Sequence, residues 1–121
     1  MMEGRCQCGL VRFTTPLPSP LKLYICHCTE CRHQSSSAFG ISAIFPTFDI
    51  PMETLGMYSR VTNANRRLDC YFCKNCGSRI VHKTNGEETL SVKGGCLVGL
   101  TKETMSGKGG VIHIWCKHAV V

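Results

Sequence analysis

Cys73-Lys74-Asn75-Cys76-Gly77 is the stretch that decides the architecture of this chain. A two-residue spacer lets both cysteine sulfurs reach one metal ion, and the glycine that follows tolerates the tight backbone of such a turn. Cys6-Gln7-Cys8-Gly9 has the same form near the N-terminus. Structural zinc is normally held by four protein ligands, so we expect the two pairs to close one site. The alternative is that they are buried free thiols, which behave as small hydrophobes, but two pairs each followed by glycine disfavour it.

A third cluster places Cys26, Cys28 and Cys31 within six residues. Three ligands leave a zinc ion one ligand short, and zinc with three protein ligands keeps a position for water or substrate. A fourth protein ligand could instead close a second structural site. The residues available for that role are His27, His33, Cys70, Cys96 and Cys116. The sequence therefore predicts two Zn²⁺ per chain, one structural and one catalytic, and the spacing alone leaves the closed alternative open.

Length and composition indicate the class of protein. A chain of 121 residues fits one domain, so residues 1–121 are expected to form a single unit. No apolar signal segment precedes Cys6, and no stretch approaches the ~20 apolar residues of a membrane span. These features favour a cytoplasmic or nuclear protein with no membrane partner, where thiols stay reduced. The net charge is +6, but the sequence contains no run of five or more Lys or Arg, which disfavours nucleic acid as a partner.

Short apolar or alternating runs, separated by Gly, Pro, Ser, Thr and Asn, predict an all-β fold. The expected strands lie at Leu10–Phe13, Leu21–Ile25, Gly40–Phe45, Leu68–Phe72, Arg79–His82, Thr89–Val92 and Val111–Trp115. Helical periodicity is weak, and the best candidate is a turn or two over Thr101–Met105 with Thr101 as the cap. The glycines of Gly107–Gly110 predict a turn.

Four segments of the chain occur in the order typical of one family: Gly4–Phe13, Cys26–Gly40, Phe72–Ser78 and His113–Trp115. Together they resemble the glutathione-dependent formaldehyde-activating enzyme family, also called the CENP-V/GFA domain. The resemblance implies an Mss4-like all-β fold, or β-tent. It also implies that Cys6, Cys8, Cys73 and Cys76 hold the structural zinc and that Cys26, Cys28 and Cys31 hold the catalytic zinc. Members commonly have glycine where this chain has Ser36, so we expect a different loop shape there.

The family reaction adds glutathione to formaldehyde and gives S-hydroxymethylglutathione, which in reverse is carbon–sulfur lyase chemistry. The resemblance thus implies a zinc-dependent enzyme acting on glutathione or another small thiol and on formaldehyde or a related aldehyde. A thiolate-ligated zinc suits a substrate thiol, because the thiolate is the nucleophile in sulfur chemistry. The alternative is a non-enzymatic, zinc-stabilised binding module of the CENP-V type. The chain lacks the long basic extension that this role would favour.

Glutathione carries two carboxylates, which would bind cationic or amide partners. Arg32 adjoins the three-cysteine cluster and is the first candidate, followed by Arg60, Arg66 and Arg67 in the segment before Cys70. Each of these is also readily explained as a solvated surface charge. Glu30 and His33 are candidate proton relays, but the pattern identifies no general base.

Overall fold

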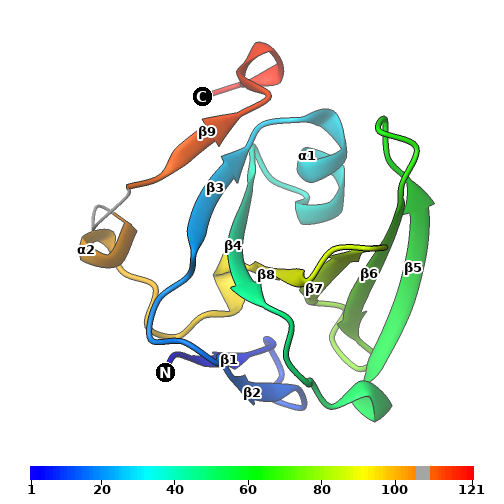
Figure 1. The fold of residues 1–121 in the computed structure, drawn as a ribbon, viewed down its shortest axis with the longest axis vertical. Helices are drawn as coiled ribbons and strands as arrows, with labels where there is room; N and C mark the ends of the chain where they lie inside the picture. Colours follow the sequence, from blue (N-terminus) through cyan, green and yellow to red (C-terminus); the bar gives the residue numbers. More distant parts are fainter. Residues whose placement is uncertain (106–109) are drawn as a thin grey trace.

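The structure is a computed structural model that describes residues 1–105 and 110–121. The strands are β1 (Glu3–Arg5), β2 (Arg12–Thr14), β3 (Lys22–Cys26), β4 (Gly40–Pro46), β5 (Leu55–Val61), β6 (Arg67–Cys73), β7 (Arg79–Thr84), β8 (Thr89–Lys93) and β9 (Ile112–Ile114). In this part of the chain, β1 and β2 form a small hairpin, and the other strands form one sheet in the order β5-β6-β7-β8-β4-β3-β9 (Figure 1). Neighbouring strands are antiparallel except β3 and β9, which are parallel. The protein is therefore mostly β-sheet, as the alternating runs predicted.

Helices are few and short. They are α1 (Thr29–Ser35), α2 (Lys102–Met105) and the 3-10 turns η1 (Met52–Thr54), η2 (Gly94–Cys96) and η3 (Cys116–His118). The predicted helix at Thr101–Met105 is confirmed as α2, and Thr101 Oγ1 accepts a hydrogen bond from the Thr104 N–H at 3.3 Å. The turn expected at Gly107–Gly110 lies, except for Gly110, outside the described residues. None of the described helices is long and apolar enough to cross a bilayer.

Two strands and one helix were not predicted. Helix α1 has seven residues and buries none of them, so it has no apolar face that a periodicity could show. Strand β5 is an edge strand with mostly exposed or half-buried residues, although it pairs with β6 along its whole length, from Leu55 opposite Cys73 to Val61 opposite Arg67. Strand β1 is three residues long. In each case pairing within the fold, rather than local pattern, determines the element.

The two faces of the large sheet differ in polarity, because successive side chains of a strand point to opposite faces. One face belongs to the hydrophobic core, with Leu23, Ala43, Phe45, Leu90 and Val92 among its buried residues. In the alternate positions the same strands carry Tyr24, Ser42, Ile44, Ser91 and Lys93. Figure 1 shows that the sheet curves, so that β3–β4 and β5–β6 stand opposite each other with α1 between their upper ends. These more polar residues line a hollow that side chains of α1 also line.

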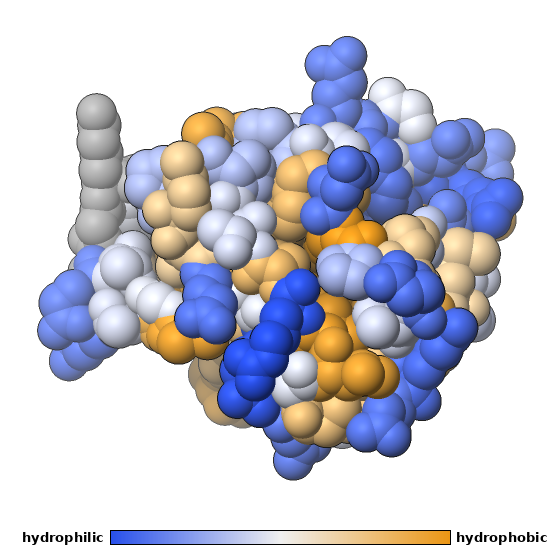
Figure 2. Space-filling model, turned by 90° about the horizontal axis from the view of Figure 1, so that it is seen from below, coloured by the Kyte–Doolittle hydropathy of each residue, from blue (hydrophilic) through white to orange (hydrophobic). Residues whose placement is uncertain are grey.

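The N-terminal hairpin covers the lower end of the sheet (Figure 1). Val11 is fully buried and Phe13 nearly so, and both belong to the same core cluster as Phe45 of β4. Phe13 and Phe45 both contact Phe48, with ring centroids 5.9 and 6.4 Å away. Viewed from this end, apolar surface is interspersed with charged side chains (Figure 2). The core thus lies between the hairpin and the sheet, on the side of the sheet away from the polar hollow.

Candidate metal centres and active site

The sulfur atoms of Cys6, Cys8, Cys73 and Cys76 converge, all within 4.8 Å of one another. The Cys6 and Cys8 sulfurs are 3.6 Å apart, and those of Cys8 and Cys73 are 3.8 Å apart. Four sulfurs placed tetrahedrally at about 2.3 Å from a zinc ion lie roughly 3.8 Å from each other, whereas a disulfide bond is only about 2.05 Å long. All four cysteines are free thiols. The spacing of the sulfurs thus fits one tetrahedral metal ion.

Backbone N–H groups surround this four-sulfur site. The Val11 N–H donates to Cys6 Sγ at 3.3 Å, and the Cys76 N–H donates to Cys73 Sγ at 3.5 Å. The pKa of Cys76 is lowered to about 5, first by the hydroxyl of Ser78, which lies 3.2 Å from its sulfur, and then by backbone hydrogen bonds. Hydrogen bonds to sulfur favour the thiolate, which is the form that binds metal.

The glycines that follow each pair have left-handed backbone conformations. Gly9 has φ +84° and Gly77 has φ +79°. This region is sterically unfavourable for residues with a Cβ but open to glycine. The chain turns back directly after the second cysteine of each pair, which confirms the role assigned to both glycines from the sequence.

The sulfur atoms of Cys26, Cys28 and Cys31 also lie within 4.8 Å of one another. Cys26 ends β3, and the other two belong to the start of α1. Cys28 is the N-cap of α1, and its sulfur accepts the Cys31 N–H at 3.2 Å. One short segment, a strand end followed by a capped helix, therefore brings three sulfurs to the upper end of the sheet.

No fourth metal-ligating residue joins this three-sulfur site within residues 1–105 and 110–121. Of the residues that could have closed it, His27 is buried and its Nε2 lies 3.0 Å from His113 Nδ1. Cys96 donates its thiol proton to the Arg79 carbonyl at 3.1 Å. An open fourth position at this site therefore stays a prediction.

The cysteines of this site differ in pKa because their thiols are hydrogen-bonded to one another. The pKa of Cys26 is lowered to about 5, chiefly because the Cys31 thiol donates a hydrogen bond to the Cys26 thiolate, although burial opposes the shift. The same hydrogen bond, with burial, raises the pKa of Cys31, since Cys31 retains the proton. A bound cation would replace the shared protons and remove the repulsion among the sulfurs. The donor set, three soft thiolates, suits zinc.

A cavity of about 780 Å³ opens beside Cys26 and Cys31 on the polar face of the sheet. Each of the seven strands of the sheet contributes to its lining, mostly through alternate residues: Tyr24 and Cys26, Ser42 and Ile44, Tyr58 and Arg60, Leu68, Arg79, His82 and Thr84, Ser91 and Lys93, and Ile114. Register explains this gathering, because Ser42 pairs with both Tyr24 and Lys93 in neighbouring strands. The rest of the lining consists of Glu30, Cys31, His33 and Gln34 of α1, together with Thr62, Glu87 and Trp115.

Three cationic side chains line this cavity: Arg60, Arg79 and Lys93. Arg60 Nε lies 3.7 Å from Glu30 Oε2, and Arg79 NH1 lies 3.1 Å from His82 Nε2. Lys93 is only 8% exposed, and its Nζ donates to Ser42 Oγ at 3.0 Å. Burial lowers the pKa of Lys93.

His82, at the base of this group, is a neutral imidazole. Burial, and then the charges of Lys93, Arg79 and Arg60, lower the pKa of His82 to about 2. Its Nε2 therefore accepts the hydrogen bond from the Arg79 guanidinium, which is always charged.

Only one of the four predicted carboxylate-binding arginines reaches the cavity. Arg60 lines it, whereas Arg32 donates to the His118 carbonyl at 3.5 Å. Arg66 pairs with Glu87 at 3.3 Å, and Arg67 pairs with Asp69 at 2.8 Å, both at the surface. The two candidate proton relays, Glu30 and His33, both line the cavity.

Sequence reasoning missed Arg79, His82 and Lys93. The available signal was Lys93, which continues the alternation of polar Thr89 and Ser91 with apolar Leu90 and Val92 along β8.

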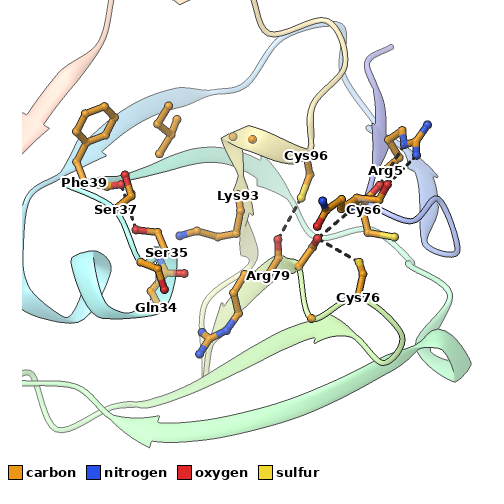
Figure 3. A pocket seen from close by; sticks show the side chains of 18 of the residues that line it. Arg5, Cys6, Gln34, Ser35, Ser37, Phe39, Cys76, Arg79, Lys93 and Cys96 are labelled. Atoms are coloured by element: carbon orange, nitrogen blue, oxygen red, sulfur yellow. Dashed lines mark hydrogen bonds between the residues drawn. The ribbon is translucent and has the colours of Figure 1, made fainter.

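A second cavity of about 910 Å³ lies between the two cysteine sites. Cys6 and Cys76 line one side of it, and the segment from Gln34 to Ile41 contributes to the other. It shares Gln34, Arg79 and Lys93 with the first cavity. Figure 3 shows Lys93 extending from β8 toward Ser35 of α1, with Arg79 nearby on β7. The three shared residues thus form the boundary between the two hollows.

Comparison with known proteins decides the family. The family profile described as glutathione-dependent formaldehyde-activating enzyme matches residues 1–118. The chain belongs to this family. A crystal structure of a Rhodobacter sphaeroides protein has a similar fold, with a TM-score of 0.65 and 24% sequence identity over 91% of this chain and 99% of that chain. No curated protein matches. Membership of the glutathione-dependent formaldehyde-activating enzyme family connects the protein to glutathione and formaldehyde, and its two cysteine clusters could hold metal ions.

Proposed function

We propose that the protein is a zinc-dependent enzyme of the carbon–sulfur lyase type, acting on glutathione or another small thiol and on formaldehyde or a related aldehyde. One observation carries this proposal. Cys26, Cys28 and Cys31 form a three-sulfur site without a fourth ligand among the described residues, and a cavity lined by two of these cysteines adjoins it. Three protein ligands beside an accessible space are the arrangement of a catalytic zinc site.

The proposal includes the architecture and the metal ligands. Cys6, Cys8, Cys73 and Cys76 would hold a structural zinc, and Cys26, Cys28 and Cys31 would hold a catalytic one. The fold would be the Mss4-like β-tent, with residues 1–121 as a single domain. The curved sheet and the sulfur pairs that join the N-terminal segment to β6 and the turn after it support this. Use of glutathione would place the protein in the cytoplasm or nucleus, where thiols stay reduced.

When bound, zinc would supply a Lewis acid that lowers the pKa of the substrate thiol. The three cysteines would hold their thiolates on one side of the site and leave the cavity side to that thiol. Its sulfur adds to the carbonyl carbon of formaldehyde, so that a carbon–sulfur bond forms and the carbonyl electron pair moves to oxygen. The proton lost by the thiol is balanced by one gained at this oxygen. Glu30 and His33 line the same cavity and are exposed, so water can carry the proton.

Exchange NMR tests this function. Wild-type protein should accelerate the interconversion of formaldehyde and glutathione with S-hydroxymethylglutathione in proportion to its concentration. Cys28→Ser should lose the acceleration, whereas Cys116→Ser, at an exposed cysteine outside both sites, should keep it. If wild-type protein leaves the exchange rate unchanged but binds DNA at physiological salt, the binding-module alternative is supported instead.

A further inference from the structure

We infer that Arg79 binds a carboxylate of the substrate and thereby makes acidic thiols the preferred substrate class. The inference rests on the proposed thiol chemistry at the three-sulfur site and names a residue that determines its specificity. Arg79 lines the cavity that Cys26 and Cys31 also line, so a ligand in this cavity has both the three-sulfur site and this guanidinium in its walls.

Charge balance in the cavity singles out Arg79. Its lining includes two carboxylates, and both already have a cationic partner: Glu30 lies 3.7 Å from Arg60, and Glu87 lies 3.3 Å from Arg66. The ion pairs within the described ranges include neither Arg79 nor Lys93. Two cations of the cavity therefore have no carboxylate partner among the described residues.

Lys93 and Arg79 differ in what offsets their charge. Three thiolates and one divalent ion carry a net charge of −1. Lys93 lines the same cavity as Cys26 and Cys31, and although burial lowers its pKa, the negative charges of these two cysteines favour its protonated form, so its charge offsets that of the metal site. Arg79 then remains as a cation without an anionic partner among the described residues. A partly buried charge without a counter-charge is costly, and a carboxylate from the ligand would relieve that cost.

Neighbouring side chains hold Arg79 ready for this contact. His82 Nε2 accepts one of its N–H bonds at 3.1 Å, and the guanidinium carbon lies 5.8 Å from the centre of the Tyr58 ring. A guanidinium has five N–H donors, so the bond to His82 leaves an edge for bidentate carboxylate binding. An uncharged thiol can reach the three-sulfur site but cannot use this edge.

Thiol titrations of the cobalt-substituted protein test the inference, with thiolate-to-metal absorption as the readout. Wild-type protein should bind glutathione about 10- to 100-fold more tightly than glutathione diethyl ester, a range expected for a hydrogen-bonded charge pair. Arg79→Gln should lose this preference by weakening glutathione binding alone, while its affinity for 2-mercaptoethanol stays within about twofold. Arg79→Lys keeps the charge without the bidentate edge and should be intermediate. The matched control is Arg12→Gln, at an exposed arginine of the hairpin, which should behave as wild type.

S-methylglutathione separates failure of this inference from failure of the proposed function. It keeps both carboxylates but has no thiol for the metal site. Calorimetry should show weak binding of S-methylglutathione to wild-type protein, and Arg79→Gln should weaken it further.

The outcomes separate the two claims. If thiols change the cobalt spectrum but Arg79→Gln and Arg79→Lys, both folded by circular dichroism, bind glutathione like wild type, the inference is wrong and the thiol chemistry stands. If no thiol changes the spectrum but S-methylglutathione binding depends on Arg79, the carboxylate site stands and the thiol chemistry is wrong. Absence of both signals overturns both.

Discussion

The two cysteine sites of this protein differ in the parts of the chain that they join. The four-sulfur site connects residues 6–8 with residues 73–76, between which the chain runs through strands β2 to β6. The three-sulfur site takes all its ligands from residues 26–31, which a strand end and a helix N-cap already hold together. A metal that joins distant segments contributes directly to folding free energy, whereas a metal held by one local segment constrains few other contacts. Similar ligands therefore serve different purposes because of chain topology.

The two sites also differ in the residues that surround them. Cys6 and Cys73 belong to the hydrophobic core cluster together with Val11 and Ile80. Cys26 and Cys31 instead line a cavity that also contains Arg60, Arg79 and Lys93. Two cysteines of the four-sulfur site are thus packed in the core, although Cys8 is exposed and Cys76 lines the second cavity, whereas the three-sulfur site adjoins the cationic cavity.

Removal of one ligand from each site should have the largest and most unequal effect. Cys73→Ser should abolish soluble expression or lower the melting temperature sharply, because binding of a structural zinc is worth on the order of 10 kcal/mol. Cys28→Ser should stay folded and lose the more weakly held zinc together with thiol-adduct activity. Circular dichroism, thermal melts and zinc analysis of both variants measure this. Equal collapse of both would show that the three-sulfur site is structural as well.

Chelation should remove the two metals in sequence. We expect roughly two Zn²⁺ per purified chain, because each cluster offers the ligands for one ion. A moderate chelator should first remove about one zinc with little change in circular dichroism, and a stronger one should then remove the second and unfold the protein. Zinc release followed with a metal-binding dye, together with circular dichroism, gives the order. Simultaneous release of both ions with unfolding would contradict a difference between the sites.

The buried imidazole of His82 should make the free energy of unfolding decrease as the pH is lowered. Its pKa is about 2 in the folded protein, against roughly 6.5 when unfolded, so only the unfolded chain takes up this proton as pH falls below about 6.5. Stability therefore decreases through this group on acidification. The free energy of unfolding of His82→Gln, relative to wild type, should increase by about 2 kcal/mol from pH 7 to pH 5.

Urea titrations at the two pH values measure this difference, and zinc loss from the cysteine sites largely cancels between the proteins. His118→Gln is the control, because this residue is only partly buried and near the end of the chain. If the difference between His82→Gln and wild type does not change with pH, His82 takes up its proton in the folded protein as readily as in the unfolded chain, and the prediction is wrong.

Ser36 should give the smallest effect. It follows α1 with φ 51°, in the left-handed region that favours glycine. Ser36→Gly should stabilise the protein by about 0.5–1 kcal/mol, because relief of the Cβ strain exceeds the added flexibility of the unfolded chain. Ser37→Gly has no such strain to relieve and should be neutral or slightly destabilising. Thermal melts compare the two variants, and equal melting temperatures would contradict the strain.

Much of the cysteine chemistry was predictable because spacing is a local property. The two-residue spacer, the following glycines and the dense Cys26–Cys31 cluster are visible in the chain, and the structure brings together the two groups of sulfurs that they predict. The alternating runs also located most strands to within a few residues, since strand periodicity is written residue by residue. Edge strand β5 and the short helix α1 were missed because pairing and capping, not periodicity, determine them.

Most strands, the two sulfur groups and the resemblance to the family are visible in the sequence. The cations that face the three-sulfur site depend instead on the tertiary structure. Arg32 is next to that site in sequence but turns to the His118 carbonyl, whereas Arg79 and Lys93, which are far from it in sequence, line its cavity. Sheet register and curvature cause this, because they bring alternate residues of seven strands onto one face. Ligand spacing is set by a few neighbouring residues, but the charge around a site is set by strand pairing across the whole chain.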